Sequence, residues 1–290
     1  MQLVVISGKG GTGKTTITSS FAYLSDSDLI KVDCDVDASN LHLMFGGKDV
    51  ERSDFYGAKV AAILEEKCKN CRKCIDICRF GAIEIINEKT VIKPMKCEGC
   101  GACLIMCEAN AISLDQELTG LTVLTESLRG MISRAEMIPG AESSGKLVTK
   151  VRKKADEIGV LKQSDRIIDG SPGVGCSVMA SVVGCDYAVI VTEPTQSGFE
   201  DFKRIYDLIK HFGIKGYVII NKYDINESIS SEIEGFCLKI KLSVIGKIPF
   251  DHLVNESINE GLPIVIYEES TAGKAIIESW NKLEKRIGVN

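Results

Sequence analysis

Short apolar segments alternate with amphipathic segments along the C-terminal half of the chain. The short runs are rich in Val and Ile and predict buried strands, and the longer stretches repeat hydrophobic residues at helical spacing. Alternation of strands and helices indicates a parallel sheet with helices on both faces. The predicted strands are 166–169, 187–192, 216–221 and 243–248, and the predicted helices are 199–212, 227–240, 251–260 and 271–287.

The N-terminal half begins with the same alternation and then departs from it. QLVVIS predicts a strand, TTITSSFAYLS has helical character, and 29–33 predicts a second strand. The region that follows mixes patterns: 59–67 has a helical pattern, 119–127 is β-like, and 146–159 predicts a helix that stops at its glycine.

The last predicted helix is amphipathic. Binding to a membrane surface is one alternative for such a helix, but here we expect the apolar face to close the sheet. That face consists of Ile276, Trp280, Leu283 and Ile287.

Composition and charge narrow the class of protein. The 290 residues, 44% of them hydrophobic, allow one large domain or two smaller ones. The net charge of −5 argues against a nucleic-acid-binding protein. No apolar run reaches the roughly 18 residues that span a bilayer, and the N-terminus shows no signal peptide. With twelve cysteines and no secretory signal, we expect a cytoplasmic protein whose closely spaced cysteines bind metal.

Residues 8–15, GKGGTGKT, match the phosphate-binding pattern G-x4-G-K-[ST] between a strand and a helix. The glycines let backbone N–H groups turn toward phosphate oxygens, Lys14 would reach the β- and γ-phosphates, and the Thr15 hydroxyl would ligate Mg²⁺. The N-terminus of the next helix adds its dipole. The predicted nucleotide-binding residues here are Gly8, Gly10, Gly11, Thr12, Gly13, Lys14, Thr15 and Thr16.

Eight of the twelve cysteines form two repeats with the spacing C-x2-C-x2-C-x3-C, at 68–78 and 97–107. The repeats begin 29 residues apart and share an Ala-Ile pair at the same offset. In bacterial two-cluster ferredoxins, three cysteines of such a repeat bind one 4Fe–4S cluster and the fourth binds the other cluster. Arg79 and Glu108 stand where proline usually follows the fourth cysteine. The predicted ligands are Cys68, Cys71, Cys74 and Cys107 for the first cluster, and Cys97, Cys100, Cys103 and Cys78 for the second.

Two zinc sites of four cysteines each are the main alternative, although the third close cysteine of each repeat fits a cubane better. The cysteine region, 65–112, is small for an independent domain, so the clusters would serve as its core. We expect it to be inserted into a discontinuous nucleotide-binding domain made of 1–64 and 113–290.

Together these motifs resemble the MinD-superfamily P-loop ATPases that contain an inserted ferredoxin domain, within the MinD/ParA/nitrogenase iron protein class. The resemblance includes a deviant Walker A sequence (9–16), a D-x-D segment, DGSPGVGC, VTEPTQSGFED and NKYD. It implies an α/β P-loop NTPase of the SIMIBI, MinD-like type, with a mostly parallel sheet and a small inserted α+β bacterial-type ferredoxin domain. It also implies a homodimer that forms on ATP binding, with Lys9 reaching the nucleotide of the facing subunit.

The same resemblance assigns roles to further residues. Asp35 would orient the attacking water, Asp33 would hold Mg²⁺ through a water, and Asp169 of the Walker B strand would position Mg²⁺. GTP stays an alternative to ATP, because N-K-x-D also reads guanine in GTPases. The implied catalytic residues are Lys9, Lys14, Asp35 and Asp169. The residues implied to surround adenine are Asn221, Pro249 and Asp251.

The remaining cysteines divide into two kinds. Cys176 lies seven residues after Asp169, where the nitrogenase iron protein has a cluster cysteine. We hypothesise that two Cys176 thiolates, one from each subunit, bind a cluster or metal; a small buried residue in a tight turn is the alternative. Cys34, Cys185 and Cys237 lie in apolar patterns and are predicted core residues.

The leading hypothesis is a Mg²⁺-dependent ATPase with two 4Fe–4S clusters. Its nucleotide-dependent dimer switch would drive either electron transfer or the assembly and delivery of metal–sulfur clusters to a protein partner. One alternative is a positioning ATPase like MinD or ParA with a redox-sensing ferredoxin insert. Another is a ferredoxin whose nucleotide domain is regulatory. We expect neither nucleic acid nor membrane as a partner.

Overall fold

The computed structural model describes residues 1–25, 29–141, 145–162 and 164–288. It divides into two compact units. The P-loop unit contains Met1–Ser53, Thr122–Glu136 and Ser143–Asn290, and the cysteine unit contains Asp54–Leu121 and Met137–Glu142. The cysteine unit is longer than 65–112 because it includes parts of two long strands that lead to and from the cysteines.

A nine-stranded sheet has the order β11-β10-β9-β1-β8-β2-β7-β6-β3. The pairs between β11 and β7 are parallel, which confirms the mostly parallel sheet. On β8, Asp169 lies level with Val5 of β1 and with Asp33 of β2, so these three strands end at the same edge. The strands are β1 Gln2–Ile6, β2 Ile30–Asp33, β3 Lys48–Ile63, β6 Ile112–Ser127, β7 Gly130–Met137, β8 Arg166–Asp169, β9 Tyr187–Thr192, β10 Lys215–Asn221 and β11 Ser243–Ile248.

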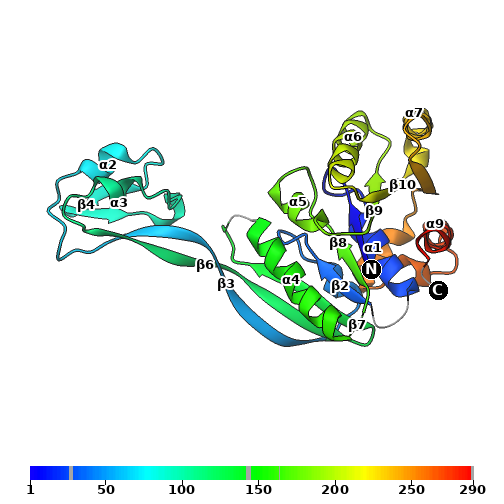
Figure 1. Ribbon diagram of the computed structural model, residues 1–290, viewed down its shortest axis with the longest axis horizontal. Helices are drawn as coiled ribbons and strands as arrows, with labels where there is room; N and C mark the ends of the chain where they lie inside the picture. Colours follow the sequence, from blue (N-terminus) through cyan, green and yellow to red (C-terminus); the bar gives the residue numbers. More distant parts are fainter. Residues whose placement is uncertain (26–28, 142–144, 163, 289–290) are drawn as a thin grey trace. The chain divides into compact units, whose positions relative to one another are not determined.

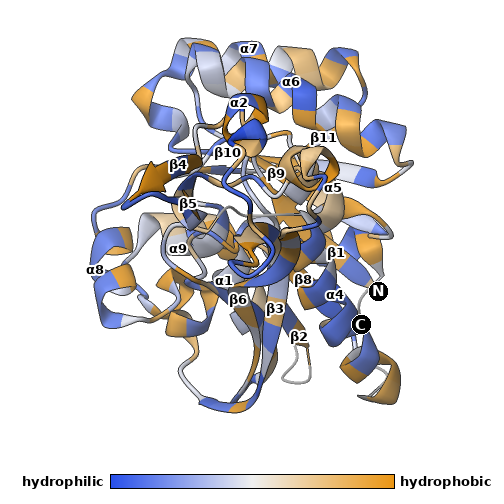
Figure 2. Ribbon diagram, turned by 90° about the vertical axis from the view of Figure 1, so that its left-hand side faces the viewer, coloured by the Kyte–Doolittle hydropathy of each residue, from blue (hydrophilic) through white to orange (hydrophobic). Residues whose placement is uncertain are grey.

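Helices cover both faces of the parallel part of the sheet (Figure 1). On one face α1 and α9 pack together, with the ring centroids of Phe21 and Trp280 5.0 Å apart. On the other face lie α4, α5, α6 and α7, and Figure 2 shows hydrophilic and hydrophobic residues alternating along α6 and α7. The helices are α1 Lys14–Leu24, α4 Gly145–Lys162, α5 Cys176–Val182, α6 Gln196–His211, α7 Glu227–Lys239, α8 Leu253–Glu260 and α9 Thr271–Ile287. Short 3₁₀ segments lie at Leu41–Met44, Pro94–Lys96, Tyr223–Ile225 and Ile264–Ile266.

The last helix closes the sheet, as predicted. Ile276, Trp280 and Leu283 are buried in the core, and Ile287 packs against it partly buried. Among the described residues, the helices are all too short or too polar to cross a bilayer.

Two local predictions were wrong. Residues 59–63 form the end of strand β3 and not a helix, because pairing with β6 overrides the helical propensity of the two alanines. Helix α4 does not stop at Gly159 but continues to Lys162. A Cβ atom on Gly159 would lie 2.5 Å from the Arg166 guanidinium, so this glycine leaves room for the arginine at a modest cost in helix propensity.

The cysteine unit contains a small antiparallel hairpin and two one-turn helices. The hairpin joins β4 (Ile83–Ile86) to β5 (Lys89–Ile92) through Asn87 and Glu88, which both have positive φ, as a tight two-residue turn requires. The helices are α2 (Lys73–Ile77) and α3 (Ala102–Met106). A small core of Ala61, Ile83, Cys103 and Ile112 lies between these elements, and four more cysteines pack around it: Cys74, Cys78, Cys97 and Cys107.

One buried cation of the P-loop unit has no carboxylate partner among the residues that the structure describes. Lys31 of β2 is fully buried, and its ammonium group donates to the backbone carbonyls of Leu29 and Arg129. It also lies 4.8 Å from the centre of the Phe45 ring. Burial, and then the nearby charge of Arg129, lower the pKa of Lys31 from 10.5 to about 8.

This buried lysine makes stability depend on pH. Its pKa is lower in the folded than in the unfolded chain, so the unfolded chain binds more protons between pH 8 and pH 10.5. The free energy of unfolding should therefore rise across that window, by about 3 kcal/mol at most. In Lys31→Met this rise should disappear. Chemical unfolding followed by the fluorescence of Trp280, the one tryptophan of the chain, measures it.

The matched control is Lys153→Met, since Lys153 is exposed on α4 and should leave the rise in place. Parallel pH curves for wild type and Lys31→Met would rule out this source of the pH dependence.

Candidate functional site

The loop between β1 and α1 has the conformation that its glycines permit. Gly11 and Gly13 have φ values of 78° and 84°, which only glycine adopts readily. The side-chain amide of Asn221, at the end of β10, donates to the Thr12 carbonyl at 2.8 Å. A Cβ atom on Gly13 would lie 2.3 Å from that amide nitrogen. Asn221 therefore holds the loop in place from the neighbouring part of the sheet.

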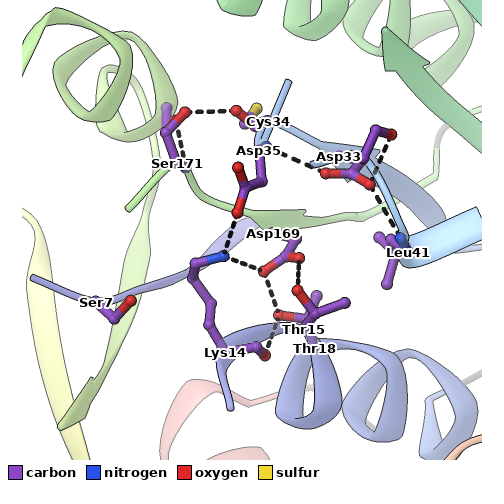
Figure 3. Close-up of polar contacts among 12 residues, drawn as sticks. Ser7, Lys14, Thr15, Thr18, Asp33, Cys34, Asp35, Leu41, Asp169 and Ser171 are labelled. Carbon is purple, nitrogen blue, oxygen red and sulfur yellow. Dashed lines mark hydrogen bonds and ion pairs between the residues drawn. The ribbon is translucent and has the colours of Figure 1, made fainter. Parts of the chain in front are cut away.

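Lys14 and two carboxylates meet where β1, β2 and β8 end (Figure 3). The Lys14 ammonium lies 3.3 Å from Asp169 and 3.4 Å from Asp35, and only about 6% of its side chain is exposed. The Thr15 hydroxyl donates to the second oxygen of Asp169 at 2.5 Å. Burial would lower the pKa of Lys14, but the charges of Asp169, Asp35 and Asp33 raise it above its ordinary value. Lys14 therefore stays protonated and positively charged.

Asp33 organises the segment that carries Asp35. It is fully buried, and its carboxylate accepts hydrogen bonds from the Asp35 N–H at 3.1 Å, the Ser39 hydroxyl at 2.9 Å and the Leu41 N–H at 3.0 Å. Burial and the neighbouring charge of Asp169 raise the pKa of Asp33. Burial likewise raises the pKa of Asp35, which is only partly exposed. Both carboxylates are repelled by the charge of Asp169, and a cation at this edge would relieve that repulsion.

The structure adds residues that the motifs did not indicate. The Thr18 hydroxyl donates to Asp169 at 3.1 Å, one helical turn after Lys14, and Ser39 contacts Asp33. Ser171, directly after Gly170, donates to the Cys34 carbonyl. Thr18 follows Lys14 by four positions and so lies on the same face of α1, and that spacing was the available signal.

Lys9 does not point into its own nucleotide site. Its ammonium group donates to the hydroxyls of Thr195 and Ser197, each at 3.2 Å, at the start of α6. Thr195 is also the N-cap of α6, accepting from the Gly198 N–H. In this conformation the lysine is bound within its own chain.

A cavity of about 200 Å³ lies beside the loop. Gly11, Gly13 and Thr16 line one side, and Asn221, Pro249 and Asp251 line another, so the predicted phosphate and adenine segments share one cavity. The Asp251 carboxylate is already occupied: it accepts from the Leu253 and Ala272 N–H groups and from the hydroxyls of Ser270 and Thr271. Asp251 therefore fixes the cavity wall.

In the cysteine unit, the eight cysteines line two separate pockets. Each pocket contains the cysteines of one predicted ligand set, namely three cysteines of one repeat and the fourth cysteine of the other repeat. One pocket, the first cysteine site, is lined by Cys68, Cys71, Cys74 and Cys107, and the other, the second cysteine site, is lined by Cys78, Cys97, Cys100 and Cys103.

The two repeats also have the same backbone conformation. Residues with positive φ occur in pairs 29 positions apart: Asn70 with Gly99, Arg72 with Gly101, and Gly81 with Asn110. The fourth cysteine of each repeat accepts a backbone N–H bond four residues on, at 3.4 Å for Cys78 and 3.2 Å for Cys107. The internal repeat is therefore a repeat of structure as well as of sequence.

The thiol groups line the walls of the two pockets and do not converge on one point. Within the described part of the chain, no three Cys, His, Asp or Glu side chains form a group that could hold a metal ion. Tetrahedral zinc needs four sulfurs about 2.3 Å from one ion.

The other four cysteines lie outside these sites. Cys176 is exposed at the first residue of α5. Cys34, Cys185 and Cys237 are buried, which confirms them as core residues. Burial raises the pKa of Cys185 to about 11 and that of Cys237 to about 12, so both stay thiols at neutral pH.

The contact between Asn221 and the loop gives a testable prediction. Asn221→Ala removes the hydrogen bond to Thr12, so the loop should lose part of its fixed conformation. One hydrogen bond contributes about 1 kcal/mol, so the Kd for nucleotide should rise about fivefold. Isothermal titration calorimetry measures it.

Asn255→Ala is the control, because Asn255 lines the same cavity and is exposed. Equal affinities for wild type and Asn221→Ala would contradict a positioning role for Asn221.

The comparisons with known proteins agree with this geometry. A relative from Methanocaldococcus jannaschii, which carries the name of an uncharacterized protein, is 32% identical, and the match covers 99% of this chain and 98% of the relative. An iron-sulfur cluster carrier protein from Pyrococcus furiosus is 24% identical, covering 99% and 86%. The structure is similar to that of the septum site-determining protein MinD of Pyrococcus horikoshii complexed with Mg-ADP, with a TM-score of 0.59, 20% identity and coverage of 99% and 97%. The model of the CobQ/CobB/MinD/ParA nucleotide binding domain matches residues 3–264, and the chain therefore belongs to this family of P-loop nucleotide-binding proteins.

Proposed function

We propose that this protein is a Mg²⁺-dependent ATPase that carries two 4Fe–4S clusters in an inserted ferredoxin domain. Its ATP-dependent dimer would couple the nucleotide state to electron transfer, or to assembly and delivery of a metal–sulfur cluster, with a protein partner as acceptor. The observation that carries the proposal is the division of eight cysteines from two interleaved repeats between two pockets.

The chemistry of the two cysteine sites supports clusters over single ions. Each site offers four thiols, and thiolates are the ligands of 4Fe–4S clusters. The fourth cysteine of each repeat lines the pocket of the other repeat, which is the ligand pattern of two-cluster ferredoxins. The small apolar core of the unit, with four buried residues, also supports a bound group that stabilises the fold. When bound, the clusters would supply one-electron redox chemistry.

The residues around Lys14 support phosphoryl transfer. ATP would replace Asp35 and Asp169 as the partner of Lys14, and Mg²⁺ would be held by Thr15 directly and by Asp33 and Asp169 through water. Asp35, freed from Lys14, would orient the water that attacks the γ-phosphorus as the bond to ADP breaks. The protein contributes position and charge neutralisation, which is most of what phosphoryl transfer requires.

Dimerisation is the proposed link between nucleotide and output. Lys9 would leave Thr195 and Ser197 and reach the nucleotide of the facing subunit. The names of the relatives give partial support, since they include iron-sulfur cluster carrier proteins and septum site-determining proteins. The second group keeps a positioning ATPase with a redox-sensing insert as the second candidate.

The content of iron and sulfide tests the cluster proposal. Anaerobically purified protein should contain about eight irons per chain and absorb broadly near 400 nm. Cys74→Ser and Cys103→Ser should each lose about half of the iron, because each alters one site. About two zinc atoms per chain in place of iron would contradict the proposal.

Cys176→Ser serves as the control, since Cys176 lines neither cysteine site. It should keep the iron of the wild type. A loss of iron only in the nucleotide-bound dimer would instead support an intersubunit site at Cys176.

A second variant tests the ATPase proposal. Asp35→Asn should lower the rate of ATP hydrolysis by about 100-fold or more, because the carboxylate that orients water is lost. The Kd for ATP should change little. Asp37→Asn is the control, as Asp37 is exposed in the same segment. Unchanged hydrolysis in Asp35→Asn would remove Asp35 from the mechanism.

Turnover experiments separate the two outputs. Electron transfer predicts that oxidation of the clusters by an acceptor depends on ATP hydrolysis. Cluster delivery predicts that iron moves to an apo-acceptor with no net redox change. Nucleotide-dependent binding to liposomes, without either output, would favour the positioning ATPase.

A further inference from the structure

The two cysteine sites are related by a repeat, but different charges surround them. The first cysteine site is lined by the cations Lys69, Arg72 and Lys73. The second is lined by the anion Glu98, and among its described lining residues there is no Lys or Arg. Arg72 corresponds to Gly101 in the other repeat, 29 positions on, and Lys69 corresponds to Glu98. The charge difference between the sites therefore arises from different residues at equivalent positions of the two repeats.

Ion pairing removes only part of the positive charge. Lys73 pairs with Glu108 at 2.5 Å, and both side chains are exposed. Lys69 and Arg72 are also exposed, and neither forms an ion pair with another described residue. The charged groups named here sum to +2 at the first site, with Glu108 counted, and to −1 at the second.

These charges act on the redox state of a bound cluster. Reduction adds one electron, and so one negative charge, to a group that already carries thiolates. Nearby cations stabilise that added charge and anions oppose it, and net charge is one of the factors that set cluster potentials.

Backbone N–H bonds to sulfur also raise the reduction potential of a cluster. Here they favour the second site, but their effect is smaller than that of the charges. The second site has two backbone N–H bonds to sulfur, from Ala61 to Cys97 and from Ala82 to Cys78, each at 3.4 Å. Among the described residues, the first site has one such bond between residues that are not sequence neighbours, from Ala111 to Cys107 at 3.2 Å. The two sites therefore differ by one N–H dipole in favour of the second site and by three unit charges in favour of the first. At similar distances from the cluster, the unit charges have the larger effect on its potential.

We propose that Lys69 and Arg72 give the first cysteine site a higher reduction potential than the second, so that the first electron added to the loaded protein resides at the first site. This rests on the proposed function, because it requires a cluster at each site. An electron that enters through the second site would then move toward the first.

A redox titration of the anaerobically purified full chain tests the order. Dithionite donates the electrons, mediators equilibrate them, and EPR follows the reduced clusters. The wild type should show two distinct potentials. Lys69→Gln combined with Arg72→Asn should lower the higher potential and leave the lower one nearly unchanged. Asparagine is used at position 72 because that residue has φ 66°, which asparagine tolerates well.

Two further variants complete the test. Glu98→Gln should raise the lower potential and not the higher one. Lys89→Gln makes the same charge change as Lys69→Gln in the same unit, but Lys89 lines neither site and should shift neither potential. Raising the salt concentration should bring the two potentials closer, because exposed charges are screened.

The outcomes distinguish the two levels of inference. A full iron content with one shared potential, or with the double variant lowering the lower potential, would overturn the proposed order while leaving the clusters in place. Protein without iron would overturn the proposed function itself and this order with it. Iron content and far-UV circular dichroism of each variant show that a shift in potential reflects charge and not lost structure.

Discussion

One buried carboxylate organises the P-loop unit. Asp169 is fully buried at the end of β8, where desolvation would be costly without partners. It is satisfied by the Lys14 ammonium and by the hydroxyls of Thr15 and Thr18. These three residues belong to the first two turns of α1, so the position of the phosphate-binding loop depends on this carboxylate. Removing it would leave Lys14 buried beside too little negative charge.

The register of the sheet makes this convergence possible. β8 lies between β1 and β2, and Asp169 is level with Asp33. The segment after β1 supplies the cation, and the segment after β2 supplies Asp35, held in place by Asp33. Residues from three distant parts of the chain thus meet at one edge, the usual position of ligand sites in parallel sheets.

The cysteine unit is built on a different principle. Its apolar core is small, and cysteines make up much of what packs around it. A short backbone motif with positive φ at equivalent positions shapes both repeats, and each fourth cysteine receives an N–H bond. β3 and β6 are long enough to belong to both units, so the chain enters and leaves the cysteines through continuous strands. In the P-loop unit, Lys154 of α4 contacts Glu51 and Ser53 of β3, and Arg152 of the same helix contacts the end of α5.

The sequence by itself determined the parallel sheet, most of its strands and helices, the glycine-rich loop after β1 and which cysteines share a pocket. These features depend on local periodicity and on fixed spacings, which the residues carry without reference to the fold. It did not determine that 59–63 is a strand, because pairing with β6 outweighs local propensity. Tertiary structure alone decided that Thr18 and Ser39 complete the polar contacts of the site, that Asp251 is occupied within its own chain, and that Lys9 binds Thr195. The contacts of Thr18 with Asp169 and of Lys9 with Thr195 join residues far apart in sequence, and the register of the strands brings these segments together. The contacts of Ser39 and Asp251 depend instead on the path of the loops that follow β2 and β11.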